Sequence, residues 1–327
     1  MTKLSSVKSV QSVFKTRRFW LTLAGAALAA GTIYYFVNRE EINYNLRLLN
    51  AKRIGDKFYA EYQYIAKDVA YGSQPRQKLD VYQPDPASPD RTDLGYPVLV
   101  YVYGGSWNSG NKELYAPVAQ RLLPEGVIVV VPDYRIYPEG KYREQTDDVA
   151  AALSWVLENI RDYGGDPARV ALGGQSAGAH LTALALLDEQ WLAKYGHSSA
   201  EVCGYYGISG VYDINAQMDF ERSKGGTAPI MTAVMEGPAN FTAASPATYV
   251  RPDLPPALLI HGDADETVPI SMSENFQAKL ESAGVQSEFV VYPGAGHSGL
   301  LFDALASNPA LLVADLSKFA RECPPAN

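Results

Sequence analysis

VALGGQSAGAH, residues 170–180, is the stretch that decides the fold of this 327-residue chain. The apolar run Val170–Leu172 predicts a strand, and the run from Ala179 to Leu187 predicts a helix. Between them, Gly174-Gln175-Ser176-Ala177-Gly178 is typical of a tight turn whose small residues let strand and helix pack closely. We therefore predict that Ser176 is a nucleophile at the N-terminus of that helix, where developing negative charge is favoured.

The rest of the chain from about Tyr62 alternates strand-like and helix-like runs without internal repeats. The clearest helix is Gln145–Tyr163, where apolar residues recur every three or four positions. Several of the strands are continuously apolar, which is typical of strands buried on both faces. This rhythm predicts an α/β fold, a mostly parallel sheet covered by helices. The predicted strands are Tyr62–Val69, Lys78–Tyr82, Val98–Tyr103, Val127–Val131, Val170–Leu172, Val202–Ile208, Ala257–Ile260 and Phe289–Tyr292.

A serine hydroxyl needs a neighbouring base, and four histidines are available. In a fold of this type the nucleophile precedes the acid, and the histidine comes last. His297 fits, because it ends the glycine-rich loop Pro293-Gly294-Ala295-Gly296-His297 directly after the last predicted strand. We expect His180 to pack beneath the turn, His197 to be solvated and His261 to brace the loop that carries the acid.

The acid is expected in HGDADETVP, residues 261–269, which follows the predicted strand Ala257–Ile260. Asp265 occupies the position of the acid in the HGxxDxxVP pattern common to this fold, so we assign it the role of holding the His297 tautomer. Asp263 is the alternative, and Glu266 is expected to face solvent.

Backbone N–H groups are expected to stabilise the oxyanion of a tetrahedral intermediate. One donor is Ala177, and the loop Tyr103-Gly104-Gly105-Ser106-Trp107 supplies Gly104 and Gly105. Trp107 could either wall the substrate pocket or belong to the core. The segment from Tyr212 to Tyr249, rich in Gly, Pro, Met and Phe, interrupts the rhythm between two predicted strands. It is predicted to form a small cap over the site, or else an irregular surface excursion.

These motifs resemble the carboxylesterase branch of the α/β-hydrolase superfamily that includes isoprenylcysteine methylesterases, kynurenine formamidases and hormone-sensitive-lipase-like esterases. The resemblance covers roughly Tyr62 to Phe319, and the prenylcysteine methylesterase type is most similar. It implies the triad Ser176, Asp265 and His297. The motifs that carry it are LDVYQP (79–84), YGGSW (103–107), PDYR (132–135), YGGDP (163–167), GQSAGAH (174–180), HGD (261–263) and GHS (296–298).

One position departs from the family pattern, because the usual histidine at the head of the oxyanion loop is Tyr103 here. The backbone donors survive this change, and the Tyr103 phenol is a candidate donor in the substrate pocket. The machinery favours a carboxylic ester hydrolase acting on a small-molecule or lipid-like ester. An amide or formamide hydrolase uses the same triad, and a catalytically silent binding module on this fold is a third possibility.

The N-terminal region carries FWLTLAGAALAAGTIYYFV, residues 19–37, without a charged residue. A helix of this length nearly spans a hydrocarbon core of about 30 Å. Lys3, Lys8, Lys15, Arg17 and Arg18 precede it, which predicts a cytoplasmic N-terminus, a signal anchor and an extracytoplasmic catalytic domain. Cleavage near Ala27-Leu28-Ala29, giving a secreted or periplasmic protein, is the alternative. The predicted parts are a basic N-terminus (1–18), the anchor (19–37), a linker (38–60) and the catalytic domain (61–327).

Composition excludes several other classes of function. The formal net charge of −8 argues against a nucleic-acid partner, because phosphate binding needs clustered Lys and Arg. Neither a phosphate-cradling GxxxxGK[ST] nor a strand-linked GxGxxG occurs, so no nucleotide cofactor is implied, and the chemistry needs no metal. Cys203 and Cys323 are the only cysteines, and the sequence leaves open whether they pair.

Overall fold

The computed structural model describes residues 46, 49–50, 52–86, 94–301 and 310–326. Asn50–Asn327 forms one compact unit, and the architecture below is that of this unit. The predicted anchor at 19–37 lies outside the described residues. Within the described ranges, no helix has both the length and the apolar character needed to cross a membrane. Residues 52–61, mostly inside the predicted linker, are helical.

The core of this unit is an eight-stranded sheet in the order β1-β2-β4-β3-β5-β6-β7-β8. β2 pairs antiparallel with β1 and β4, and all the other pairs are parallel. Each of the eight predicted strands corresponds to one of them, which confirms the mostly parallel α/β architecture. The strands are β1 (Ile65–Ala70), β2 (Lys78–Tyr82), β3 (Tyr96–Val102), β4 (Ile128–Pro132), β5 (Gly165–Gln175), β6 (Gly204–Ile208), β7 (Ala257–Gly262) and β8 (Ser287–Tyr292).

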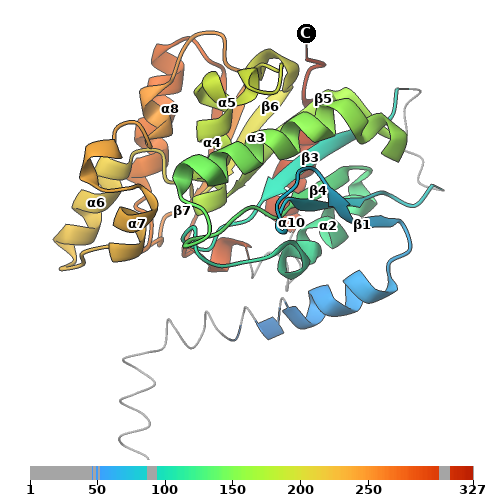
Figure 1. The fold of residues 1–327 in the computed structure, drawn as a ribbon, viewed down its shortest axis with the longest axis horizontal. Helices are drawn as coiled ribbons and strands as arrows, with labels where there is room; N and C mark the ends of the chain where they lie inside the picture. Colours follow the sequence, from blue (N-terminus) through green and yellow to red (C-terminus); the bar gives the residue numbers. More distant parts are fainter. Residues whose placement is uncertain (1–45, 47–48, 51, 87–93, 302–309, 327) are drawn as a thin grey trace, which may run out of the picture. The chain divides into compact units, whose positions relative to one another are not determined.

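Helices cover both faces of the sheet (Figure 1). On one face α3 and α4 pack together against β5, and on the other α2 and α10 pack together against β4 and β3. The α-helices within the described ranges include α2 (Ala116–Leu122), α3 (Tyr142–Asn159), α4 (Ala177–Leu187), α5 (Gln190–Ala193), α6 (Ile214–Ser223), α7 (Pro229–Val234), α8 (Ser271–Ser282) and α10 (Ala310–Glu322). Short 3₁₀ helices lie at Lys112–Tyr115, Leu123–Glu125, Ile160–Tyr163, Ser199–Glu201, Pro238–Asn240 and Pro246–Thr248.

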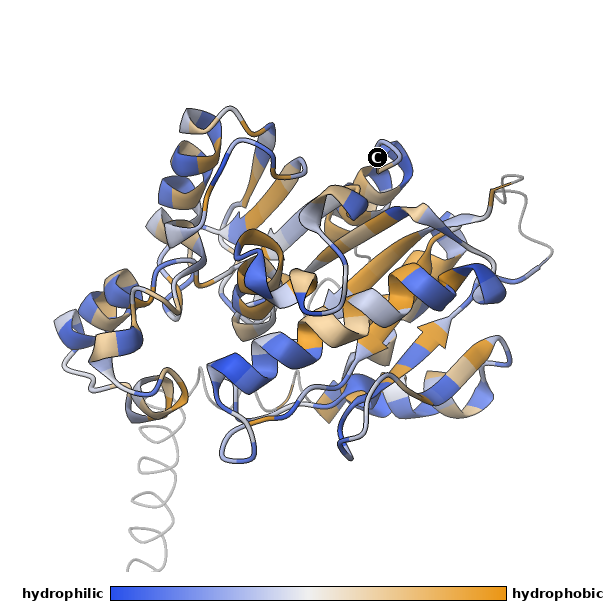
Figure 2. Cartoon of the chain, turned by 45° about the horizontal axis from the view of Figure 1, so that its top comes forward, coloured by the Kyte–Doolittle hydropathy of each residue, from blue (hydrophilic) through white to orange (hydrophobic). Residues whose placement is uncertain are grey.

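Burial follows the position of each strand in the sheet. Every residue of β3 and β4 is buried, because helices cover both faces of these central strands. The edge strands β1 and β8 contain exposed residues among half-buried ones. Figure 2 shows the same contrast as hydrophobic central strands between helices that carry hydrophilic residues on their outer sides. The packed apolar side chains of the interior therefore hold the carboxyl ends of β3, β5, β6 and β7 in fixed positions.

The two cysteines, whose pairing the sequence left open, form a disulfide. Cys203 directly precedes β6, and Cys323 directly follows α10. Their Cα atoms are 5.5 Å apart, although 120 residues separate them in the chain. The bond therefore ties the C-terminal helix to the amino end of β6, the end opposite to Ile208.

Candidate active site

Ser176 lies in a strained turn between β5 and α4. Its φ of 54° and ψ of −120° are outside the regions that a side chain favours, at a cost of roughly 1–3 kcal/mol. The flanking glycines allow the close packing that forces this turn. A Cβ atom on Gly174 or Gly178 would lie 2.1 or 2.0 Å from the Val102 carbonyl oxygen. The Ser176 N–H donates to Ile208 O over 2.9 Å, which ties the turn to β6.

Three loops that follow different strands bring a serine, a histidine and a carboxylate into one hydrogen-bonded chain. Ser176 Oγ lies 2.9 Å from His297 Nε2, and His297 Nδ1 lies 2.7 Å from Asp265 Oδ2. These are the three residues that the sequence nominated, separated by 121 and 32 positions. The Asp265 side chain is fully buried, whereas the His297 side chain remains 16% exposed. The imidazole can therefore meet a substrate while its partner is shielded from water.

Four hydrogen-bond donors surround the Asp265 carboxylate. Its Oδ1 accepts the backbone N–H groups of Thr267 and Val268, each over 2.9 Å. Its Oδ2 faces His261 Nε2 at 3.2 Å as well as His297. Burial alone would raise the pKa of Asp265, but the hydrogen bonds from His261 and His297 outweigh it and hold that pKa well below its usual range. The carboxylate thus stays ionised as an acceptor.

The other residues weighed from the sequence have different partners. Asp263 Oδ1 accepts the Gly294 N–H over 2.6 Å and so supports the loop that carries His297. His261 is fully buried between Ser273 Oγ and the acid loop. The expectation that His197 is solvated is wrong, because its ring lies between Glu201 and Glu158 with 13% of its side chain exposed. A pair of carboxylates attracts the imidazole and covers it.

The oxyanion loop (Tyr103–Trp107) lies directly against the serine. A Cβ atom on Gly104 would be 3.0 Å from Ser176 Cβ and 2.4 Å from Gln175 Oε1, so only glycine allows this approach. Gly105 has a φ of +122°, and its carbonyl accepts Asn108 N–H, Ser109 N–H and Ser109 Oγ. The structure thus brings Gly104 against Ser176, while the role of Gly104, Gly105 and Ala177 as oxyanion donors stays a prediction.

The structure corrects the assignment of Tyr103 and Trp107 to the substrate pocket. Tyr103 is fully buried, and its hydroxyl donates to Asp133 Oδ1 over 2.6 Å while accepting from Arg76 Nη2 over 2.8 Å. The phenol therefore points behind the loop and is no donor to substrate. Trp107 is 5% exposed, with its indole N–H bonded to His180, so the core alternative holds. Packing these two aromatic rings in the core is more favourable in free energy than exposing them in a polar cleft.

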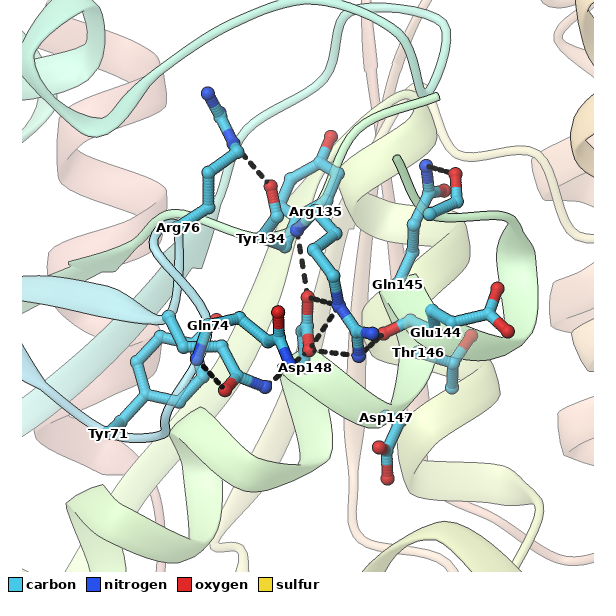
Figure 3. A network of polar contacts seen from close by, with 12 residues as sticks. Tyr71, Gln74, Arg76, Tyr134, Arg135, Glu144, Gln145, Thr146, Asp147 and Asp148 are labelled. Atoms are coloured by element: carbon cyan, nitrogen blue, oxygen red, sulfur yellow. Dashed lines mark hydrogen bonds and ion pairs between the residues drawn. The ribbon is translucent and has the colours of Figure 1, made fainter. Parts of the chain in front are cut away.

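A polar network, which the sequence did not reveal, surrounds Tyr103 at the position where the family pattern has a histidine. Arg76 Nε donates to Tyr134 O, and its Nη2 donates to Gly110 O, three residues after the oxyanion loop. Figure 3 shows Arg76 beside Tyr134, and Arg135 paired with Asp148 on α3. The fully buried Asp148 accepts three Arg135 nitrogens, one from the backbone and two from the guanidinium. The only hint in the sequence was charge within the PDYR motif.

The segment Tyr212–Tyr249 contacts two of the catalytic elements. Gln217 on α6 donates through Nε2 to Thr267 O in the acid loop over 2.9 Å. Ala244 O lies 2.7 Å from His180 Nε2 on α4. The predicted cap is therefore anchored beside the nucleophile helix and the acid loop, while its role over a substrate stays a prediction. Among the described residues, no cluster of His, Cys, Asp or Glu is arranged to hold a metal ion.

Comparison with known proteins gives a family assignment. The family model BD-FAE matches residues 79–280, which is more than half of the chain. The chain belongs to the BD-FAE family. A probable isoprenylcysteine alpha-carbonyl methylesterase from Oryza sativa subsp. japonica is 35% identical over 277 residues, covering 81% of this chain and 65% of that protein. Esterase LipQ from Mycobacterium tuberculosis is 34% identical over 269 residues, covering 79% of this chain and 62% of that protein.

Solved structures include an esterase of similar fold. A truncated form of a carbohydrate esterase from gut microbiota is 25% identical, with a TM-score of 0.65 over 80% of this chain and 96% of that one. The α/β-hydrolase fold and the resemblance to carboxylesterases are thereby confirmed. This BD-FAE chain spans less than two thirds of the length of the curated relatives above, so their activities are a basis for a proposal.

Proposed function

We propose that this BD-FAE family member is a serine carboxylesterase that cleaves a carboxylic ester through an acyl-enzyme. The observation that carries the proposal is the unbroken chain Ser176 Oγ–His297 Nε2–Asp265, with hydrogen bonds of 2.9 and 2.7 Å. The serine needs a base within hydrogen-bond reach, and the base needs an orienting acid. All three are present, and the names of the relatives as esterases support the same chemistry.

The reaction follows from these contacts. Ser176 Oγ attacks the ester carbonyl carbon as its proton passes to His297 Nε2, and the ionised Asp265 stabilises the imidazolium. The N–H groups of Ala177, Gly104 and Gly105 stabilise the oxyanion of the tetrahedral intermediate. His297 then protonates the departing alkoxide, which leaves Ser176 acylated. Water activated by the same imidazole releases the acid and restores the hydroxyl.

The substrate is a small-molecule or lipid-like ester. The plant relative is named as a probable isoprenylcysteine alpha-carbonyl methylesterase, an enzyme that acts on a methyl ester. The test is hydrolysis of p-nitrophenyl acetate, butyrate and octanoate by the full-length chain in mild detergent. We expect turnover of at least one ester and labelling of Ser176 by a fluorophosphonate. A folded protein that hydrolyses N-formyl anilides but none of the esters would instead establish the formamide alternative.

A membrane anchor with the catalytic domain on the extracytoplasmic side completes the proposal. The charge-free run at 19–37 and the five preceding basic residues support it. The Cys203–Cys323 disulfide supports an oxidising compartment. Expressed in its native host, the chain should resist carbonate extraction from membranes and retain its N-terminal residues by intact mass. A soluble protein that begins after Ala29 would establish signal cleavage instead.

A further inference from the structure

His180 contacts three segments whose relative positions matter for the proposed reaction. It lies on α4 one turn after the nucleophile, and its backbone N–H donates to Ser176 O over 3.0 Å. Its ring is completely buried, with Nδ1 3.1 Å from the Trp107 indole nitrogen and Nε2 2.7 Å from Ala244 O. One side chain thus joins the nucleophile helix, the oxyanion loop and the segment Tyr212–Tyr249.

The chemistry of the two partners determines the tautomer of His180. An indole nitrogen can only donate a hydrogen bond, so Nδ1 must present a lone pair to Trp107. A carbonyl oxygen can only accept, so Nε2 must carry the proton that faces Ala244. Burial also lowers the pKa of His180 to about 4, which keeps the ring neutral at ordinary pH. Ala244 therefore fixes His180 as an acceptor for Trp107.

The indole that His180 holds belongs to a strained part of the oxyanion loop. Ser106 and Trp107 have φ values of 50° and 62°, which residues with a side chain rarely adopt. Such a conformation persists only where the surroundings over-determine it. The Trp107 carbonyl accepts Tyr137 N–H over 2.9 Å and Gln145 Nε2 over 2.8 Å. His180 adds a restraint at the indole end, where the centroids of the two rings are 5.4 Å apart and the rings meet edge to face.

We propose that His180 is a positioning residue, which holds the oxyanion loop in its strained conformation by accepting the Trp107 indole hydrogen bond. The inference rests on the proposed function, because it concerns the geometry of the oxyanion donors Gly104 and Gly105. Without the acceptor, the loop can relax away from Ser176. The donors then miss the oxyanion, although the triad remains intact.

The test uses the full-length chain with p-nitrophenyl acetate and its thiono analogue as substrates. His180→Leu removes the acceptor, and Trp107→Phe removes the donor. Because one oxyanion donor contributes roughly 10²- to 10³-fold to kcat, we expect each variant to lose about 10- to 100-fold in kcat with little change in KM. The preference for the oxo over the thiono ester should fall in both, because misplaced donors no longer favour oxygen.

Two further variants separate positioning from packing. His180→Asn places a carbonyl oxygen near the position of Nδ1, so it should recover most of the kcat that His180→Leu loses. Tyr205→Phe is the matched control, because its buried hydroxyl donates to Ala179 O on the same helix over 2.9 Å without touching the loop. It should lower the melting temperature while leaving kcat and the oxo preference unchanged.

The double variant His180→Leu/Trp107→Phe tests whether the two side chains act on kcat through the same hydrogen bond. If His180 acts through the indole, the double variant has nearly the kcat of either single variant. The inference would be overturned if the two single-variant losses in kcat multiplied in the double variant. It would also be overturned if His180→Leu, like Tyr205→Phe, kept the kcat and the oxo preference of the wild type. If the wild type shows no hydrolysis that depends on Ser176, the proposed function fails, which is a distinct result from either of these.

Discussion

Ser176→Ala is expected to lower kcat for p-nitrophenyl esters by about 10⁴- to 10⁶-fold, because alanine leaves His297 without a nucleophile to activate. The residual rate would come from water attack assisted by the oxyanion donors. Stability should change little, since alanine keeps the Cβ atom at the same strained φ of 54°. Steady-state kinetics on the purified full-length chain, with fluorophosphonate labelling in parallel, measure the loss.

The matched control for this variant is Ser154→Ala. Ser154 is also buried, and its hydroxyl donates to Ala150 O within α3, outside the turn between β5 and α4. It should keep wild-type kcat and lose only a little stability. Retention of activity in Ser176→Ala would mean that another group attacks the ester, and the assignment of Ser176 as the nucleophile would then be wrong.

The sequence predicted most of the fold because its signals are local. Continuous apolar runs indicated the central strands, and the glycines around Ser176 indicated the turn between strand and helix. β5 nevertheless begins at Gly165 rather than Val170, because Gly165 pairs with Tyr96 across the sheet. Such pairing leaves no trace in the apolar pattern of residues 165–169. Boundaries of this kind depend on tertiary contacts.

The sequence predicted the three triad residues of the site but not the contacts that support them. Asp265 and His297 follow strands in recognisable motifs, so their chain order was enough to nominate them. The direction of the Tyr103 phenol depends on Arg76 and Asp133, which lie 27 and 30 positions away. The disulfide likewise joins residues 120 positions apart. No local pattern encodes those distances, so the sequence left these contacts undetermined.

Four of the seven non-glycine residues with positive φ in the described part of the chain follow strands at one edge of the sheet. Ser106 and Trp107 follow β3, Ser176 follows β5 and Ser209 follows β6, and all four have positive φ values. The carboxyl ends of neighbouring parallel strands lie at the same edge, where open α/β sheets bind ligands. Strain of roughly 1–3 kcal/mol per residue is retained there because the packed core and the hydrogen bonds around it hold the backbone. This edge is therefore pre-organised before any substrate arrives.

Asp265→Asn is expected to lower kcat/KM by about 10⁴-fold without disturbing the fold. The reason lies in the donors around the carboxylate. Thr267 and Val268 N–H both point at Oδ1, so the asparagine oxygen stays there and its NH₂ group takes the place of Oδ2. That NH₂ donates to His297 Nδ1, which must now accept. The imidazole proton moves to Nε2 and faces Ser176, so no lone pair remains to take the serine proton.

Asp263→Asn is the control that separates the two candidate acids. Its carboxylate accepts only the Gly294 N–H among the contacts described, and an asparagine oxygen can do the same. Activity close to wild type is therefore expected. In the Asp265→Asn variant the imidazole is in the wrong tautomer, and a change of pH does not correct that. Raising the pH should therefore restore activity only in the range where the serine hydroxyl ionises by itself. If Asp263→Asn loses activity and Asp265→Asn keeps it, then Asp263 is the acid, and the observed pairing of His297 with Asp265 would not be the catalytic one.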